Sequence, residues 1–89
     1  MAMRYTVLLA HAPEGGYVVR VPALRGCVTV GDNLADALEN AREAILAYLE
    51  SLAMDGTAPP EDRAVVELYD DEEEAWVLRL TVGEVRAVA

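Results

Sequence analysis

The chain has 89 residues, enough for one small domain and too few for two. Apolar residues make up 54%, so a hydrophobic core is expected. Sixteen acidic and seven basic residues give a net charge of −9. Phosphate backbones repel such an acidic chain, so direct nucleic-acid binding is not expected. The charge suits either plain solubility or a basic protein partner.

Neither export nor membrane insertion is expected. Cys27 is the single cysteine, so no internal disulfide can form. No apolar run approaches the roughly 20 residues that a membrane span needs. Residues 1–12 also lack the layout of a signal peptide. The simplest expectation is a cytoplasmic protein.

Three strands are predicted in the first third of the chain. Residues 3–11 and 17–21 are rich in β-branched and aliphatic side chains, and Pro13–Gly16 between them is a turn sequence, which predicts a hairpin. Pro22 ends the second strand, because proline has no N–H for a ladder hydrogen bond. A short loop leads to a third strand over residues 27–30.

A helix is predicted over residues 34–54. Asn33 is the expected N-cap, Asp36 lies in the first turn, and Gly56 suits a left-handed C-terminal stop. Leu46 falls outside the apolar stripe and is expected on the surface. The predicted stripe comprises Leu34, Leu38, Ala41, Ile45, Tyr48, Leu49 and Leu52.

Residues 61–71 admit two interpretations. Glu61 and Asp62 favour the start of a short helix, whereas the neighbouring valines also suit a strand. We prefer the short helix. Residues 75–82 form a clear strand. The fold class predicted for residues 1–89 is therefore a single α+β domain of two layers, β-β-β-α-(short α)-β, with the main helix packed on one face of the sheet.

Alternation along the strands divides the sheet into two faces. The purely apolar positions are expected to face the helix, with Val28 and Val30 among them and Trp76 in the core. The other face mixes arginine with aliphatic side chains, a composition common at protein interfaces. The alternative is an ordinary sheet face that is exposed to water and binds no partner. The predicted self-interface, which favours a homo-oligomer, consists of Arg4, Thr6, Leu8, Val18, Arg20, Val77 and Arg79.

No catalytic or metal-binding constellation is evident. His11 has no second histidine or nearby cysteine and is expected at the surface. Cys27 has no activating base nearby in the sequence and is expected to be a small, buried or half-buried residue. The acidic run Asp70–Glu74 lacks the alternating spacing and central glycine of a calcium loop. No catalytic residue, metal ligand or cofactor is assigned.

Residues 17–34, YVVRVPALRGCVTVGDNL, resemble the signature of HicB-like antitoxins. That pattern runs G-Y, a few strand residues, V-P-x-L-x-G-C, and then a G-D-(T/S/N)-x-x-E-A-L helix start. Gly15–Tyr17 and Ala37–Ala41 extend the match to about residues 3–52. The resemblance implies a partial RNase H-like fold. It also implies a non-catalytic protein that binds and neutralises a small basic HicA-type ribonuclease toxin.

The chain departs in two ways from the pattern that this resemblance implies. RNase H enzymes carry a catalytic Asp in the first strand, and residues 3–10 contain no carboxylate. Many HicB-like antitoxins also carry a C-terminal DNA-binding module, but only seven residues follow Val82, so operator binding is not expected. A residual nuclease is therefore disfavoured. An orphan homo-oligomer without a toxin is the main alternative.

If a basic toxin is bound, charge complementarity predicts an acidic contact surface. The predicted partner-binding residues are Glu67, Asp70, Asp71, Glu72, Glu73 and Glu74.

Overall fold

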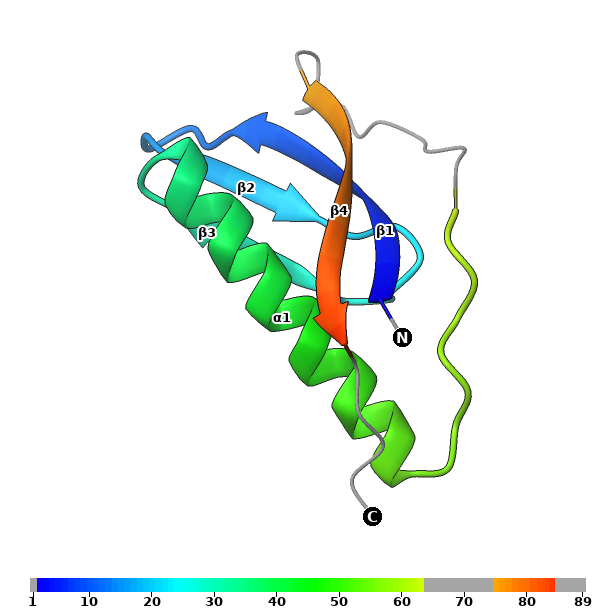
Figure 1. Ribbon diagram of the computed structural model, residues 1–89. Helices are drawn as coiled ribbons and strands as arrows, with labels where there is room; N and C mark the ends of the chain where they lie inside the picture. Colours follow the sequence, from blue (N-terminus) through cyan, green and yellow to red (C-terminus); the bar gives the residue numbers. More distant parts are fainter. Residues whose placement is uncertain (1, 64–74, 85–89) are drawn as a thin grey trace.

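The computed structural model describes residues 2–63 and 75–84. Its strands pair in antiparallel fashion in the order β3-β2-β1-β4, and the helix lies across one face of this sheet (Figure 1). The two-layer α+β architecture is as predicted. The elements are β1 (Ala2–His11), β2 (Tyr17–Arg20), β3 (Val28–Gly31), α1 (Leu34–Met54) and β4 (Ala75–Glu84).

Two tight connections join the first three strands. Gly15 and Gly16 adopt φ values of 102° and 77°, and the N–H of Ala12 donates to the carbonyl of Gly16 at 3.0 Å, which closes the hairpin. Between β2 and β3, the N–H of Val21 donates to the carbonyl of Cys27, also at 3.0 Å. This second loop brings Cys27 back beside the end of β2.

The ends of α1 follow the predicted capping. Oδ1 of Asn33 accepts the N–H of Asp36 at 2.8 Å. At the other end, Gly56 adopts φ 73°, and the N–H of Thr57 donates to the carbonyl of Leu52 at 2.8 Å. These bonds form a Schellman-type stop, which satisfies carbonyls that the helix cannot pair internally.

The core lies between α1 and the sheet. Gly31 allows the two layers to approach, because a Cβ at this position would lie 2.3 Å from the backbone nitrogen of Ala37 and 2.5 Å from its Cα. A small residue on each layer therefore fixes the contact between β3 and the start of α1. The core cluster consists of Tyr5, Val7, Leu9, Val19, Val21, Leu24, Cys27, Ala37, Ala41, Ile45, Leu49, Leu80 and Val82.

The predicted helical stripe was wrong at two positions. Leu34 is exposed, whereas Leu46 packs partly buried against the core. Leu34 lies nearly one turn before Ala37, the first helical residue buried against the sheet. Leu46 lies one turn after Arg42, whose guanidinium reaches β4, so this flank of the helix faces the sheet.

The orientation predicted for the third strand was also wrong. Val28 and Val30 are 54% and 61% exposed, whereas Cys27 is buried in the core. The register pairs Val28 with Arg20, which faces away from the helix. Gly31 accounts for this orientation. It contacts α1 so closely that only a residue without a side chain fits there, so Gly31 and the alternate residues of the strand face the helix, and Val28 and Val30 face away from it.

The first half of β4 extends beyond the cover of the helix. Leu80 is buried as expected, but Trp76 and Leu78, on the same face, are 47% and 36% exposed. Figure 1 shows α1 and the start of β4 well apart and approaching each other further along the strand. The prediction that Trp76 belongs to the core was therefore wrong.

Residues 61–63 are not helical, so no helix begins at Glu61 or Asp62. The rest of residues 61–71 lies outside the described residues, as does the choice between helix and strand there.

Candidate protein-binding surfaces

The sheet face turned away from α1 contains the predicted self-interface. Its residues divide into exposed Arg4, Val77 and Arg79, half-buried Val18 and Arg20, and buried Thr6 and Leu8. The structure adds two residues that the sequence analysis placed in the core, Val28 and Val30. The accessible part of this face therefore combines arginine with exposed valine.

One carboxylate anchors the segment after α1 to this face. Oδ1 of Asp62 accepts the backbone N–H of Thr6 at 2.8 Å, and Oδ2 accepts the Thr6 hydroxyl at 2.6 Å. The guanidinium of Arg79 lies 3.9 Å from Oδ2. Because β2 pairs with β1 only from Leu8 onward, Asp62 occupies the position beside β1 that the shorter strand leaves open.

The neighbouring Tyr5 hydroxyl donates to the carbonyl of Pro60 at 2.6 Å. Burial raises the pKa of Tyr5, and the negative charge of Asp62 raises it further. Sequence reasoning missed this cluster because Thr6 and Asp62 are 56 positions apart and neither belongs to a motif. All of these groups have partners within the chain, so their arrangement is structural.

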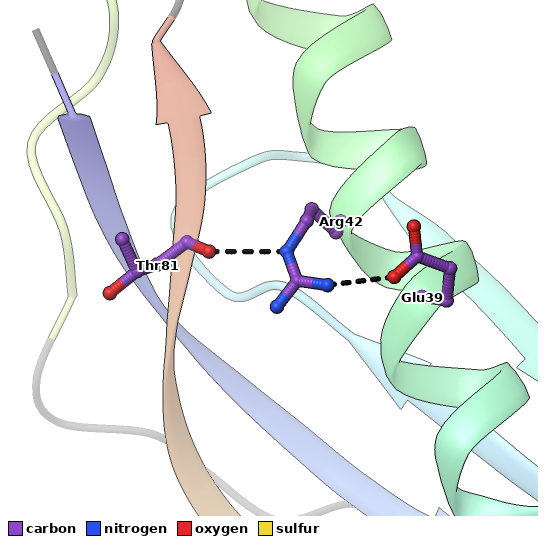
Figure 2. A network of polar contacts seen from close by, with 3 residues as sticks. All are labelled: Glu39, Arg42 and Thr81. Atoms are coloured by element: carbon purple, nitrogen blue, oxygen red, sulfur yellow. Dashed lines mark hydrogen bonds and ion pairs between the residues drawn. The ribbon is translucent and has the colours of Figure 1, made fainter.

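A second polar contact joins α1 to the edge strand β4. Nε of Arg42 donates to the carbonyl of Thr81 at 3.2 Å, and Nη1 of Arg42 donates to Oε2 of Glu39 at 2.8 Å (Figure 2). At the opposite edge, Nδ2 of Asn40 donates to the carbonyl of Val30 at 2.9 Å. The helix thus occupies one carbonyl on each edge strand, which limits sheet extension by another chain at these points.

Three rings from adjacent strands meet where the sheet emerges from under the helix. The ring centroids of His11 and Tyr17 are 4.8 Å apart. His11 also meets Trp76 edge-on, with centroids 5.3 Å apart. His11 is exposed, as predicted, and Tyr17 is half-buried. We call His11, Tyr17 and Trp76 the aromatic end of the sheet.

Several other sequence predictions concern possible chemistry. Cys27 is a buried free thiol, and burial raises its pKa, so the sulfur stays protonated at neutral pH and is a poor nucleophile. Across residues 2–63 and 75–84, no group of three or more His, Cys, Asp or Glu side chains could hold a metal ion. The helix in this part of the chain is not apolar enough to span a membrane. The predicted partner-binding residues, Glu67 and Asp70–Glu74, lie outside the described residues.

Comparison with known proteins gives a consistent result. The family model described as HicB_like antitoxin of bacterial toxin-antitoxin system matches residues 5–85. A UPF0150 protein of Thermoplasma acidophilum is 48% identical over 62 residues, covering 70% of this chain and 90% of that protein.

Two solved structures share the fold. A chain of a toxin-antitoxin complex from Streptococcus pneumoniae has a TM-score of 0.75 at 16% identity, covering 93% of this chain and 70% of that one. The N-terminal domain of the Burkholderia pseudomallei antitoxin HicB has a TM-score of 0.64 at 29% identity, covering 92% of this chain and 98% of that domain. Because the family model spans nearly the whole chain, the chain belongs to the HicB-like antitoxin family of bacterial toxin-antitoxin systems.

Proposed function

We propose that this protein is a non-catalytic antitoxin that binds a small basic HicA-type ribonuclease toxin in the cytoplasm and neutralises it. The observation that carries the proposal is the family match over residues 5–85. The fold adds support, because a chain of the pneumococcal toxin-antitoxin complex shares it over 93% of this sequence. The net charge of −9 suits a basic partner.

The chemistry of the described residues agrees with a binding role. The buried thiol of Cys27 has a raised pKa and is held away from solvent. The carboxylate of Asp62 is occupied by Thr6 and lies near Arg79, so it is engaged in the fold. The sheet offers a partner exposed apolar side chains on both of its faces, and the helix side adds the aromatic ring of Trp76.

Co-expression tests this function directly. A HicA-type toxin from the same genome is induced in cells with and without this chain, and growth and messenger RNA levels are followed. We expect the toxin alone to arrest growth and deplete messenger RNA, and the chain to restore both. Arrest that persists while the chain accumulates as folded protein would contradict the proposal.

A second candidate function is an orphan homo-oligomer without a toxin. It is favoured by the exposure of Val28 and Val30 beside Val18 on the outward sheet face. Light scattering of the purified wild-type chain and of the Val30→Glu variant measures their oligomeric states and tests this function. A defined oligomer that Val30→Glu dissociates would support this function. A monomer at high concentration would exclude it.

A further inference from the structure

Among residues 2–63 and 75–84, no element covers the aromatic end of the sheet, because the helix crosses the sheet obliquely. At its start, α1 lies against β3, where Ala37 meets Gly31. By its third turn it has reached the later part of β4, where Arg42 binds the carbonyl of Thr81 (Figure 2). The helix does not cover the corner between these two contacts, which holds the start of β4 and the end of β1.

The side chains in this corner are large and contiguous. His11 contacts both Tyr17 and Trp76, so the rings span three neighbouring strands, β2, β1 and β4. Trp76 is 47% exposed although it belongs to the face that holds the core. Tryptophan and tyrosine are the residue types that most often dominate binding energy at protein interfaces. A contiguous, exposed cluster of aromatic rings is therefore typical of the centre of a protein-binding surface.

The described charged residues that flank the aromatic end in sequence or register are acidic. Glu14 lies in the exposed turn that joins His11 to Tyr17. Asp32 follows Gly31, the register partner of Tyr17, and Asp36 lies in the first turn of α1; both are exposed. No arginine occurs in residues 10–17 or 31–36. In the sequence, the acidic run ends immediately before Ala75, the first residue of β4.

We propose that the aromatic end, with its border of Glu14, Asp32 and Asp36, is the surface on which the basic protein partner docks. An arginine or lysine of the partner stacks on the indole of Trp76, because tryptophan is the aromatic side chain that attracts cations most strongly. The acidic border draws the partner in and sets its orientation. This inference rests on the proposed function, since its occupant is the basic HicA-type toxin named there.

Trp76 and Met54 form a pair for the test. Both are exposed apolar side chains, but Met54 is the last residue of α1 and belongs to neither candidate binding surface. The dissociation constant of a purified HicA-type toxin from the same genome is measured for the wild-type chain, Trp76→Ala and Met54→Ala. We expect Trp76→Ala to weaken binding about tenfold or more, and Met54→Ala to leave it nearly unchanged.

The fluorescence of the wild-type chain gives an independent readout, because Trp76 is its only tryptophan. Docking at the aromatic end should bury the indole and shift its emission to shorter wavelength. This site would be overturned if toxin binding left the emission of the wild-type chain unchanged and Trp76→Ala bound the toxin as tightly as the wild-type chain. The proposed function would still stand. Failure of the wild-type chain to bind the toxin would overturn both.

Charge reversal keeps the inference testable if circular dichroism shows that Trp76→Ala is unfolded. Glu14 and Glu50 are both exposed, but Glu14 borders the aromatic end and Glu50 lies near the far end of α1. We expect Glu14→Lys to slow toxin association severalfold more than Glu50→Lys. Equal association rates for the two variants would overturn the proposed docking surface.

Discussion

Gly31 shows how one residue sets the distance between the two layers of the fold. Its neighbour across the interface is the backbone of Ala37, which cannot withdraw as the end of a flexible side chain can. We expect Gly31→Ala to lower the free energy of unfolding by about 2 kcal/mol, because an added methyl group overpacks the contact. Urea denaturation measures this, with Val30→Ala, an exposed neighbour, as the control. Equal midpoints for the two variants would contradict the assigned packing.

Tyr5 makes stability depend on alkaline pH. Its folded-state pKa is raised above the ordinary value of 10.0 by burial and by Asp62, so the unfolded chain ionises first as the pH rises. The stabilisation is complete below pH 10 and is lost as the pH rises from there through the folded-state pKa. We expect Tyr5→Phe to remove this component of the alkaline loss. It should also cost about 1 kcal/mol at neutral pH, through the missing bond to Pro60.

Thermal melts between pH 8 and pH 11 test this expectation, with Tyr48→Phe as the control that keeps Tyr5. If Tyr5→Phe and Tyr48→Phe lost stability in parallel above pH 10, the role given to the Tyr5 hydroxyl would be wrong.

At the scale of elements, Arg42 links α1 to the edge of the sheet. It satisfies the carbonyl of Thr81 and also pairs with Glu39, a contact exposed to solvent (Figure 2). We expect Arg42→Ala to cost about 1 kcal/mol, because the hydrogen bond to β4 is lost. Glu39→Ala should cost less, about 0.5 kcal/mol or below, because exposed ion pairs contribute little. Denaturant titrations that rank the variants in the opposite order would refute this role for Arg42.

Local sequence signals predicted the elements well. The Pro-Glu-Gly-Gly turn, the Asn33 cap and the Gly56 stop each act through the backbone within a few residues, so they can be read directly from the sequence. The bounds of α1 were predicted to the residue, and every strand in the described parts of the chain to within two residues.

Long-range features could not be predicted in the same way. Apolar alternation placed Val28 in the core, but the register with Arg20 and the contact at Gly31 turn it outward. The cover of Trp76 depends on the crossing direction of α1, which no local pattern encodes. The aromatic end therefore emerged only from the structure, whereas the family was already indicated by the motif in residues 17–34.

At the scale of the whole molecule, a net charge of −9 should act mainly on the rate of association. We expect the association rate constant with a basic toxin to fall severalfold or more as the salt concentration rises, because ions screen the attraction. Charge reversal at Asp71 and Glu73 should lower it further, since both belong to the predicted partner-binding run. Stopped-flow mixing measures both effects. An association rate constant that changes neither with salt concentration nor with charge reversal would show that electrostatic steering plays no part.

The central claim is that this chain silences a toxin by binding it. The most direct measurement is RNA cleavage by a purified HicA-type toxin from the same genome, titrated with the purified chain. We predict that cleavage falls in proportion to added chain and stops at a fixed stoichiometric ratio, while the chain alone leaves the RNA intact. Undiminished cleavage in the presence of excess folded chain would contradict the claim.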